Sequence, residues 1–452
     1  MKVSIVVLAA LGTILPAAAA TVADVTLAYD AEACVVTIDY TLDAPAIVTL
    51  AGSIAGEPLT GAETAALTDR GNRLTPAGTH TVVWELRQSL TERKFRVSDL
   101  RVSVSAWPTN NGPDYMAVDL VNPDTVRYYP SVAALPEPID SDRWRTTEML
   151  FRKIPAKDVL WQRGSPENET GHNTSGGYEQ RHWVKLTSNY YMGVFECTQK
   201  QWTLVYGSNS NHSEFTGGDE SVWGTRPVDK AFFYELNAYN KGIRDNNWPG
   251  EDEASGHAVT TETTFVYRLR AHCGLGLYLD LPTSAQWEFA CRAGTGTALP
   301  NGGEIAPESV VLEGRDCSLV AADPALEAIA RYRMNSGAAG GVTAGKEVST
   351  TAQGTARVGS YAPNVWGLYD MIGNVGEWVL DYYTAYAANT KETAEVDPRG
   401  DSGSSINNRV IRGGSWQTPN LRLSLRSAAV GTYGTVGSNG RGFRMCLTLK
   451  GE

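Results

Sequence analysis

The twelve residues from Gly367 to Trp378 read GLYDMIGNVGEW and combine three glycines, two carboxylates and a tryptophan. Glycines at this density indicate tight turns, because glycine adopts backbone conformations that other residues avoid. A tight glycine turn can also bring carboxylate and carbonyl oxygens together. The whole chain of 452 residues has 45 glycines and 12 tryptophans. We therefore expect a fold with many loops, held by aromatic packing and low in regular structure.

The composition of the chain excludes several classes of protein. Acidic residues outnumber basic ones by 50 to 39, the net charge is −11, and only 20% of the residues are charged. Nucleic-acid binding needs clustered Lys and Arg, and a long coiled coil needs more charged residues than this. With roughly 100–200 residues per domain, the length predicts two or three domains.

The first 20 residues resemble a secretory signal peptide. Lys2 gives a positive start, Val3–Leu15 is apolar, and Pro16–Ala20 supplies small residues for cleavage after Ala19 or Ala20. The alternative interpretation is a short N-terminal membrane anchor, but the apolar run is short for a bilayer span. The sequence therefore predicts an exported protein, either periplasmic, secreted or on the cell surface, without a transmembrane segment.

Residues 21–129 have the pattern of an all-β domain. Apolar residues alternate with polar ones in Cys34–Leu42, Val82–Leu86 and Leu100–Ala106, which is typical of half-buried strands. Several short strands in this length predict a sandwich of the immunoglobulin or fibronectin type. The sequence shows no chemistry in this domain, which favours a spacer or adhesion module. Residues 130–144 contain three prolines and predict a semi-rigid linker.

Residues 145–452 form a separate region with few clear helices. Thr198 and Gln201 form a capping box, in which the threonine hydroxyl accepts a backbone hydrogen bond and the glutamine reaches back. Thr283 and Gln286 repeat this pattern before Trp287. The sequence therefore predicts two short helices among glycine-rich loops and short strands.

A series of short motifs runs through this C-terminal region in a fixed order. Each motif is weak evidence alone, but the ordered set over about 300 residues is specific. The motifs are Phe151–Pro155, Tyr191–Gly193, Glu196–Thr198, Arg226–Val228, Leu281–Ala290, Val358–Ser360, Gly367–Met371, Gly373–Trp378, Arg412–Trp416 and Gly442–Arg444. In this order they resemble the formylglycine-generating enzyme, or sulfatase-modifying factor, domain family. The resemblance implies a C-type-lectin-like α+β fold, low in regular structure and often bound to calcium.

Active members of that family oxidise a cysteine in a sulfatase peptide, within a Cys-x-Pro-x-Arg motif, to formylglycine. They use oxygen and one Cu(I) ion held by two cysteines, and soft Cu(I) prefers thiolate sulfur. The first family cysteine follows the Gly-Gly-Ser-aromatic motif by two residues, where this chain has Thr418. No cysteine occurs between Cys317 and Cys446. We therefore do not expect a copper site.

The remaining pocket residues also differ from the family pattern. Gly376 stands where the family often has a tryptophan, and Ser415 survives without a thiol partner, so Ser415, Thr418 and Gly376 would form a degenerate pocket. We expect Cys291 and Cys446 to pack in the core or form disulfides, although six cysteines allow 15 full pairings. The six histidines have no HxxxH spacing, so an iron site of the kind used by a related branch is not expected.

One metal site of the family matches in part. The resemblance assigns a calcium ion to Asp370, the backbone carbonyls of Gly373 and Val375, and Glu377. A hard cation needs several such oxygens. The alternative is structural, with Asp370 capping the turn and Glu377 paired with an arginine such as Arg412.

Two functions from different classes follow. The first is a binding module for a peptide, protein or glycan, whose groove would be lined by Arg412, Ser415, Trp416, Arg426 and Arg444. The second is a formylglycine-generating oxidoreductase that uses a rearranged site. In a third, weaker hypothesis the β-domain itself is a cell-surface adhesin.

Overall fold

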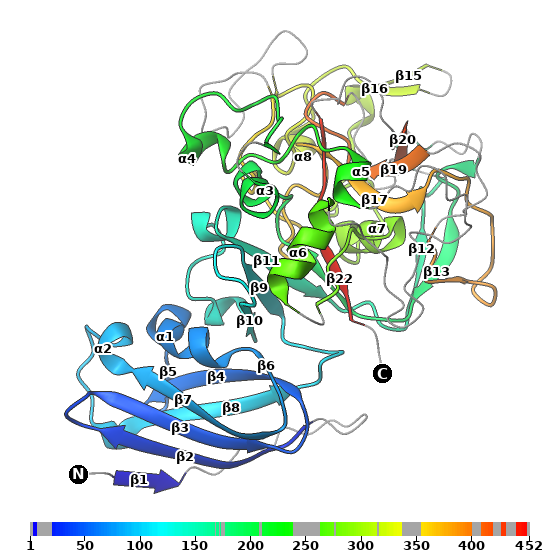
Figure 1. Ribbon diagram of the computed structural model, residues 1–452. Coiled ribbons are helices and arrows are strands. Elements are labelled where there is room, and N and C mark those ends of the chain that lie inside the picture. Colours follow the sequence, from blue (N-terminus) through cyan, green and yellow to red (C-terminus); the bar gives the residue numbers. More distant parts are fainter. Residues whose placement is uncertain are drawn as a thin grey trace. The chain divides into compact units, whose positions relative to one another are not determined.

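The structure of the chain is a computed structural model that consists of two compact units (Figure 1). Unit 1 comprises residues 1–118, 125–143 and 449–452, and unit 2 comprises 119–124 and 144–448. Of residues 130–144, expected to form a linker, 130–143 are part of unit 1 and Trp144 is part of unit 2. The structure describes residues 3–6, 20–167, 169–170, 172, 177–207, 210–237, 263–274, 277–313, 316–336, 354–399, 408–418, 426–430 and 440–449.

Unit 1 contains two antiparallel β-sheets. The first sheet has the order β1-β2-β3-β7, and the second has β4 paired with β5, β6 and β8. The strands are β1 (Val3–Val6), β2 (Val22–Asp30), β3 (Val35–Leu42), β4 (Ala46–Ile54), β5 (Glu57–Pro58), β6 (Leu74–Thr75), β7 (Gly78–Glu85) and β8 (Leu100–Trp107). A separate antiparallel pair is formed by β9 (Tyr115–Asp119) and β10 (Val126–Tyr129).

The two sheets share one apolar core, as expected for a sandwich. In β3 the residues Val36, Ile38, Tyr40 and Leu42 are buried and alternate with partly exposed neighbours, which confirms the predicted period of two. Trp84 of β7 is fully buried in the same core. In β4 successive residues from Ala46 to Leu50 are all buried, so both faces of this strand are covered.

Helix α1 (Gly61–Gly71) is an addition to the predicted all-β domain. Thr60 accepts a hydrogen bond from the Glu63 backbone, and the Glu63 side chain accepts one from Thr60. This capping box was present in the sequence and stabilises the start of the helix. The helix packs against β4 and β7, one strand from each sheet (Figure 1). Short helical turns also occur at α2 (Leu86–Ser89), η1 (Val97–Asp99) and η2 (Val132–Ala134).

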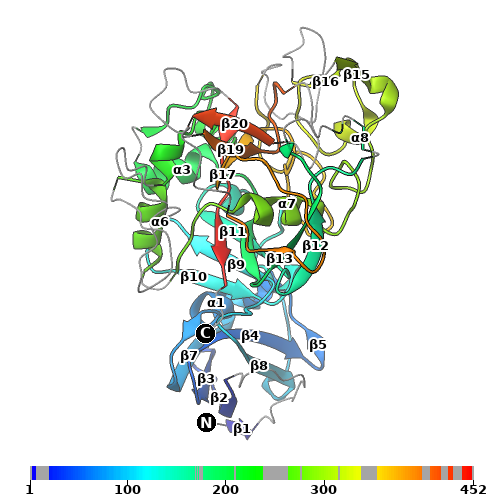
Figure 2. The same cartoon turned by 90° about the vertical axis from the view of Figure 1, so that its right-hand side faces the viewer.

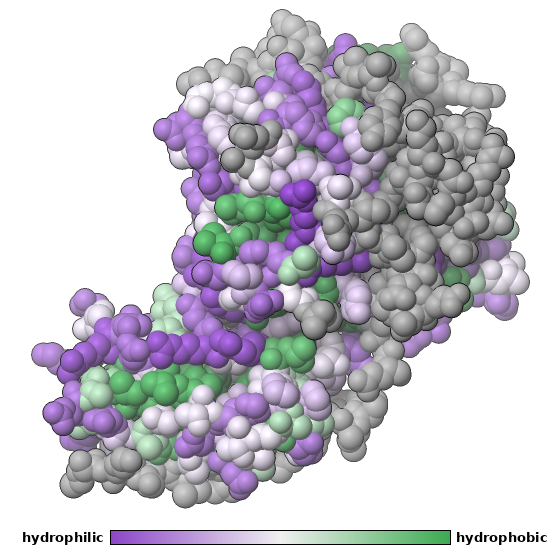
Figure 3. Space-filling model, viewed as in Figure 1, coloured by the Kyte–Doolittle hydropathy of each residue, from purple (hydrophilic) through white to green (hydrophobic). Residues whose placement is uncertain are grey.

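The surface of unit 1 mixes apolar and polar side chains. Leu74 and Val83 are 53% and 37% exposed. Figure 3 shows hydrophobic surface beside hydrophilic residues on the face that carries β5 and β7. Scattered apolar surface of this kind is normal on folded domains.

Unit 2 is α+β with short elements, as the resemblance implied. One antiparallel sheet contains β11 (Glu148–Ile154), β14 (Tyr190–Gly193) and β22 (Cys446–Thr448). A second contains β12 (Val159–Arg163), β13 (His182–Leu186) and β18 (Glu395–Val396). A third has the order β20 (Arg426–Val430), β19 (Asn408–Arg412), β17 (Gly376–Tyr382) and β21 (Arg441–Gly442), and β15 (Val310–Glu313) pairs with β16 (Asp316–Leu319).

The helices of unit 2 have between three and nine residues. They are η3 (Asp142–Arg145, which begins at the end of unit 1), α3 (Gln199–Tyr206), α4 (Glu220–Trp223), α5 (Phe233–Leu236), α6 (Phe265–Cys273), α7 (Ser284–Arg292), η6 (Pro307–Ser309) and α8 (Pro324–Glu327). The capping boxes predicted at Thr198 and Thr283 both begin helices, α3 and α7. Figure 2 shows α7 near the centre of unit 2, beside β17 and β12.

Aromatic side chains fill the interior of unit 2. Trp202, Trp287 and Trp378 are fully buried, and Trp416 is 3% exposed. Trp202 stacks on Phe265 with ring centroids 5.2 Å apart. The expected role of the tryptophans in packing is confirmed.

No helix among the described residues is long and apolar enough to cross a membrane. Of the expected signal peptide, Val3–Val6 pair with β2 as strand β1, and residues 7–19 lie outside the described part of the chain. Signal-peptide cleavage therefore stays a prediction.

Candidate functional site: a buried charge network beside a hydroxyl pocket

Glu377 and Arg444 form an ion pair in the interior of unit 2. Glu377 lies on β17, and its carboxylate accepts hydrogen bonds from the Arg444 guanidinium at 2.7–3.1 Å. Trp287 donates its Nε1–H to Glu377 Oε2 at 2.7 Å. The exposed fractions of Glu377 and Arg444 are 1% and 0%. Glu377 therefore pairs with an arginine, as the alternative to a calcium site predicted. The arginine is Arg444 and not Arg412.

Two further carboxyl groups lie close to this pair. Glu196 accepts hydrogen bonds from Asn374 Nδ2 at 2.7 Å and from the Val375 backbone at 3.1 Å. Burial, together with the charges of Asp370 and Glu377, raises the pKa of Glu196 well above its ordinary value. The sequence interpretation missed Glu196 as a member of this cluster, although it stands in the Glu196–Thr198 motif.

Asp370 has one oxygen that would suit a cation. Its Oδ2 accepts a hydrogen bond from the Gly359 backbone at 2.6 Å, whereas its buried Oδ1 has no hydrogen-bond partner. Burial raises the pKa of Asp370 to about 6. The positive φ angles of Asp370, Gly373 and Asn374 (53°, 82° and 54°) confirm the tight turn predicted here.

The expected calcium ligands do not fit the ion as a set. Arg444 already neutralises Glu377, and a cation beside Asp370 would have to compete with that guanidinium. Among the described residues, no three His, Cys, Asp or Glu side chains are grouped so that they could hold a metal ion. The orphaned oxygen of Asp370 is the one feature that supports calcium.

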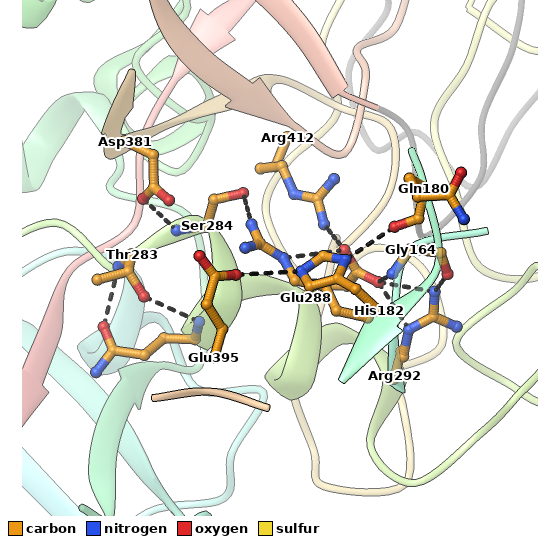
Figure 4. A network of polar contacts seen from close by, with 12 residues as sticks. Gly164, Gln180, His182, Thr283, Ser284, Glu288, Arg292, Asp381, Glu395 and Arg412 are labelled. Carbon is orange, nitrogen blue, oxygen red and sulfur yellow. Dashed lines mark hydrogen bonds and ion pairs between the residues drawn. The ribbon is translucent and has the colours of Figure 1, made fainter. Parts of the chain in front are cut away.

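A second buried network is centred on Glu288 of helix α7 (Figure 4). Its carboxylate forms ion pairs with Arg292, Arg412 and Arg163 and accepts a hydrogen bond from the Gly164 backbone. Burial alone would raise the pKa of Glu288, but Arg292, Arg412 and Arg163 together lower it far below the usual range.

The Glu288 network extends to neighbouring loops and strands, as Figure 4 shows. Arg163 donates to Ser284 Oγ at 2.5 Å, and the Ser284 backbone donates to Asp381 at 2.6 Å. His182 lies 3.6 Å from a Glu395 oxygen. The network thereby ties α7 to β12, β13, β17, β18 and β19.

The degenerate pocket contains two hydroxyl groups in contact. The Oγ of Ser415 and the Oγ1 of Thr418 are 3.0 Å apart, and the Ser415 backbone donates to Thr418 Oγ1 at 2.8 Å. The Gly376 backbone donates to the Gly440 carbonyl at 2.8 Å, which brings residue 440 next to this pocket. A Cβ on Gly440 would lie 2.8 Å from Ser415 Oγ, so only glycine lets the backbone approach so closely.

Four of the five expected groove residues, Arg412, Ser415, Trp416 and Arg444, are buried. Arg412 and Arg444 are fully buried, because each guanidinium neutralises a carboxylate inside the unit. Trp416 is buried and its ring packs edge-on against Phe215. The side chain of Arg426 lies outside what the structure describes, as do residues 419–425 and 431–439 of the expected groove loops. Ser415 and Thr418 are thus the part of the groove that the structure places together.

The described cysteines show no arrangement that could replace the missing thiol pair. Cys197, Cys273, Cys291 and Cys446 are buried, and they are free thiols, as is Cys34. Burial raises the pKa of Cys273 to about 12 and that of Cys446 well above its ordinary value. Thiols that remain protonated are poor metal ligands. These four cysteines therefore pack in the core, one of the two roles expected for Cys291 and Cys446.

The described geometry defines an α+β domain whose loops are held by buried arginine–carboxylate pairs. Residues 157–449 match the model of the sulfatase-modifying factor enzyme 1-like domain family. The chain belongs to this family. The predicted fold class, a C-type-lectin-like α+β domain after a β-sandwich, is confirmed.

Individual relatives cover only parts of the chain. The formylglycine-generating enzyme of Thermomonospora curvata is 34% identical over 140 residues, which are 30% of this chain and 38% of the enzyme. The chaperone protein LppX of Paenibacillus barcinonensis is 27% identical over 238 residues, 50% of this chain and 73% of the chaperone. Among solved structures, PvdO of Pseudomonas aeruginosa matches 66% of this chain and 94% of its own, at 17% identity and a TM-score of 0.43. The family thus includes both an enzyme and a chaperone.

Proposed function

We propose that unit 2 is a binding module for a peptide or protein segment and does not generate formylglycine with copper. The hydroxyl pair of Ser415 and Thr418 carries this proposal. By the resemblance, Thr418 stands where active relatives have the first of two cysteines. Hydroxyl groups are hard ligands and do not hold Cu(I) as thiolates do. The same hydroxyls can donate and accept hydrogen bonds with the backbone of a bound peptide.

The relatives support a binding role. A chaperone acts by binding another protein without changing its covalent structure, and the LppX chaperone matches this chain over more residues than the Thermomonospora enzyme does. The charge networks tie the strands and loops of unit 2 together, and a binding loop needs a rigid scaffold of this kind. We further propose that the protein is exported after cleavage behind Ala19 or Ala20. Mass spectrometry of the N-terminus of secreted material tests this second proposal.

The binding role can be tested with a random-peptide display library selected against the full chain. We expect enriched peptides to lose at least about tenfold in affinity when Thr418→Arg fills the pocket, because an arginine there removes the hydroxyl and its space. Thr147→Arg, a substitution on an exposed threonine of the same unit, should leave the affinity unchanged. No enrichment of any peptide, or enriched peptides whose affinity is the same for the parent and for Thr418→Arg, would reject this site.

Copper chemistry provides the opposing test. The full chain would be titrated with Cu(I) and given oxygen and a peptide with the Cys-x-Pro-x-Arg motif. We expect no stoichiometric copper binding and no oxygen consumption above that of copper alone. Stoichiometric copper with turnover would establish the alternative, an oxidoreductase with a rearranged site.

Calcium is a separate proposal that rests on Asp370. If the ion binds there, calcium should raise the unfolding temperature of unit 2, and Asp370→Asn should remove most of that rise. An unfolding temperature of unit 2 that is the same with calcium and with a chelator would reject the site, and Arg444 would explain why.

A further inference from the structure

A cavity in unit 1 lies outside the family domain and is part of neither proposed site. It lies at one end of the sandwich, between the turn that joins β2 to β3 and the segment from α2 to η1, and has a volume of about 560 Å³. Sites for small ligands commonly have volumes in this range. Its lining consists of Tyr29, Cys34, Leu86, Arg87, Leu90, Thr91, Arg93, Lys94, Phe95 and Val97.

The floor of the cavity is apolar. Leu86 and Leu90 are part of the sandwich core and are 3% and 6% exposed. Tyr29, Cys34 and Phe95 are partly buried and pack against that core. An apolar ligand in this cavity would therefore extend the hydrophobic core of the unit and cover side chains that are now partly wet.

The rim of the cavity is positively charged. Arg93 forms an ion pair with Glu63. Among the described residues, neither Arg87 nor Lys94 pairs with a carboxylate, and Arg87 makes only a long contact of 3.4 Å to the Glu32 carbonyl. Two cations without a carboxylate partner thus stand on the rim of an apolar cavity.

Acidic side chains also lie at this end of the unit, and one of them, Asp30, is engaged within a turn. Asp30 accepts hydrogen bonds from the backbones of Glu32 and Ala33 at 3.0 and 3.1 Å, which fixes the turn between β2 and β3. Burial and the neighbouring Cys34 thiol raise the pKa of Tyr29, Asp30 adds to this rise, and the positive charge of Arg87 opposes it. Arg87 therefore acts on Tyr29, which lines the same cavity.

We propose that this cavity binds a small amphipathic carboxylate, of the class of medium-chain fatty acids. The aliphatic chain lies on Leu86, Leu90 and Phe95, and the carboxylate is held by Arg87 and Lys94. A cation next to a carboxylate gives the stronger kind of hydrogen bond, and the apolar floor supplies the area-dependent part of the affinity. This role is independent of the function proposed for unit 2.

Decanoate, decanol and decyltrimethylammonium are suitable probes, each used with the full chain below its micelle-forming concentration. We expect calorimetry to show that decanoate binds, that decanol binds more weakly, and that the cationic probe binds weakest of the three. Bound decanoate should also slow maleimide labelling of the half-buried Cys34, followed by peptide mass spectrometry so that other thiols do not interfere.

Two variants test the binding of the carboxylate and the binding of the aliphatic chain separately. Arg87→Glu with Lys94→Glu should weaken decanoate at least about tenfold and leave decanol unchanged. Val97→Trp should fill the cavity and remove the binding of both probes without changing the charge. Arg73→Glu with Arg101→Glu, on exposed arginines of the same unit that do not line the cavity, is the matched control for charge and should bind decanoate like the parent.

Each result decides the proposal. Equal binding of decanoate and decyltrimethylammonium, or decanoate binding that survives both the double reversal and Val97→Trp, would overturn it. The unfolding temperature of unit 1 is recorded for every variant, and a variant that fails to fold is replaced by Arg87→Gln with Lys94→Gln, for which loss of the preference for decanoate over decanol is expected.

Discussion

The two units bury polar groups in different ways. Among the described residues of unit 1, the buried polar side chains are neutral: Thr49, Thr64, Thr68, Asn72 and Thr75. Unit 2 buries many charged side chains, and Arg163, Arg331, Arg412 and Arg444 are among its largest fully buried residues. Both units have an apolar core, so the core does not explain why, in the part of the chain that the structure describes, only unit 2 buries charged side chains. We attribute this difference to the way in which each unit satisfies its buried backbone polar groups.

The length of the regular elements explains the contrast. Strands β2, β3, β4, β7 and β8 of unit 1 have eight or nine residues, so the sheet ladders satisfy most backbone groups. Unit 2 is largely loop, and buried loop carbonyls need other donors. Arginine has five N–H donors and remains charged, which suits it to this task.

Individual arginines illustrate this role. Arg444 donates to the carbonyls of Gly193, Val194 and Tyr369 as well as to Glu377. Arg331 donates to the carbonyls of Gly354 and Asn335. Unit 2 thus uses buried arginines where unit 1 uses sheet ladders, and two of them, Arg412 and Arg444, also pair with a buried carboxylate. The comparison predicts that charge changes affect unit 2 far more than unit 1.

The largest effect is expected for Glu288→Gln. The change leaves Arg163, Arg292 and Arg412 buried without their shared carboxylate, and breaking a buried ion pair from one side typically costs about 3–5 kcal/mol. We expect unit 2 to lose about that much unfolding free energy and unit 1 to lose none. Urea unfolding followed by hydrogen exchange, with peptides assigned to each unit, measures both.

Glu308→Gln is the matched control, because Glu308 is exposed in the same unit and undergoes the same chemical change. Its effect should stay within about 0.5 kcal/mol. If Glu288→Gln were as mild as this control, the charge network would not be what holds the loops, and the contrast between the units would fail.

The second prediction concerns the dependence of stability on pH. Burial raises the pKa values of Asp229, Asp280 and Asp370 in unit 2 to about 6, above the value of about 3.9 for an unfolded aspartate. The folded state therefore binds more protons than the unfolded state between about pH 4 and 6. The unfolding free energy of unit 2 should rise as the pH falls from 7 to 5, by about 1 kcal/mol for each carboxyl group.

Unit 1 should behave differently over the same range. The pKa of Glu63 is lowered by the Thr60 backbone hydrogen bond and by Arg93, so its contribution is present above the unfolded pKa of about 4.3 and is lost only below it. Hydrogen exchange at pH 7 and 5, corrected for the intrinsic exchange rate, should show a gain for unit 2 and no change for unit 1. Asp280→Asn should reduce the gain, and a gain of equal size in both units would contradict the assignment to these carboxyl groups.

Sequence reasoning succeeded where the signal is local. The alternation in β3, the capping boxes at Thr198 and Thr283 and the glycine turn at Gly373 each depend on residues close together in the chain. The ordered motifs gave the family in the same way. Helix α1 carried an equally local signal, the Thr60 and Glu63 pair, and the interpretation as an all-β domain passed over it.

The charge partners could not be derived from the sequence. Glu377 pairs with Arg444, 67 positions away, and Glu288 pairs with Arg412, 124 positions away. Several arginines in the motifs fit either carboxylate by charge, and only the packing of α7 against β17 and β19 decides between them. For the same reason, the sequence analysis predicted that Arg412 and Arg444 line a ligand groove. In the structure both side chains are buried in the core.

The smallest effect is expected at the helix starts, where the two units use the same device. Thr60→Ala in unit 1 and Thr283→Ala in unit 2 each remove one side-chain cap, from α1 and α7. The loss of such a cap costs typically about 1 kcal/mol, and we expect a similar loss of unfolding free energy in the unit that carries the change. Serine at either position should restore most of the loss, since its hydroxyl can make the same hydrogen bond. If Thr283→Ala reduced the unfolding free energy several times more than Thr60→Ala, the cap of α7 would also be needed to position Glu288. The long-range charge network would then depend on a hydrogen bond between residues close together in the chain.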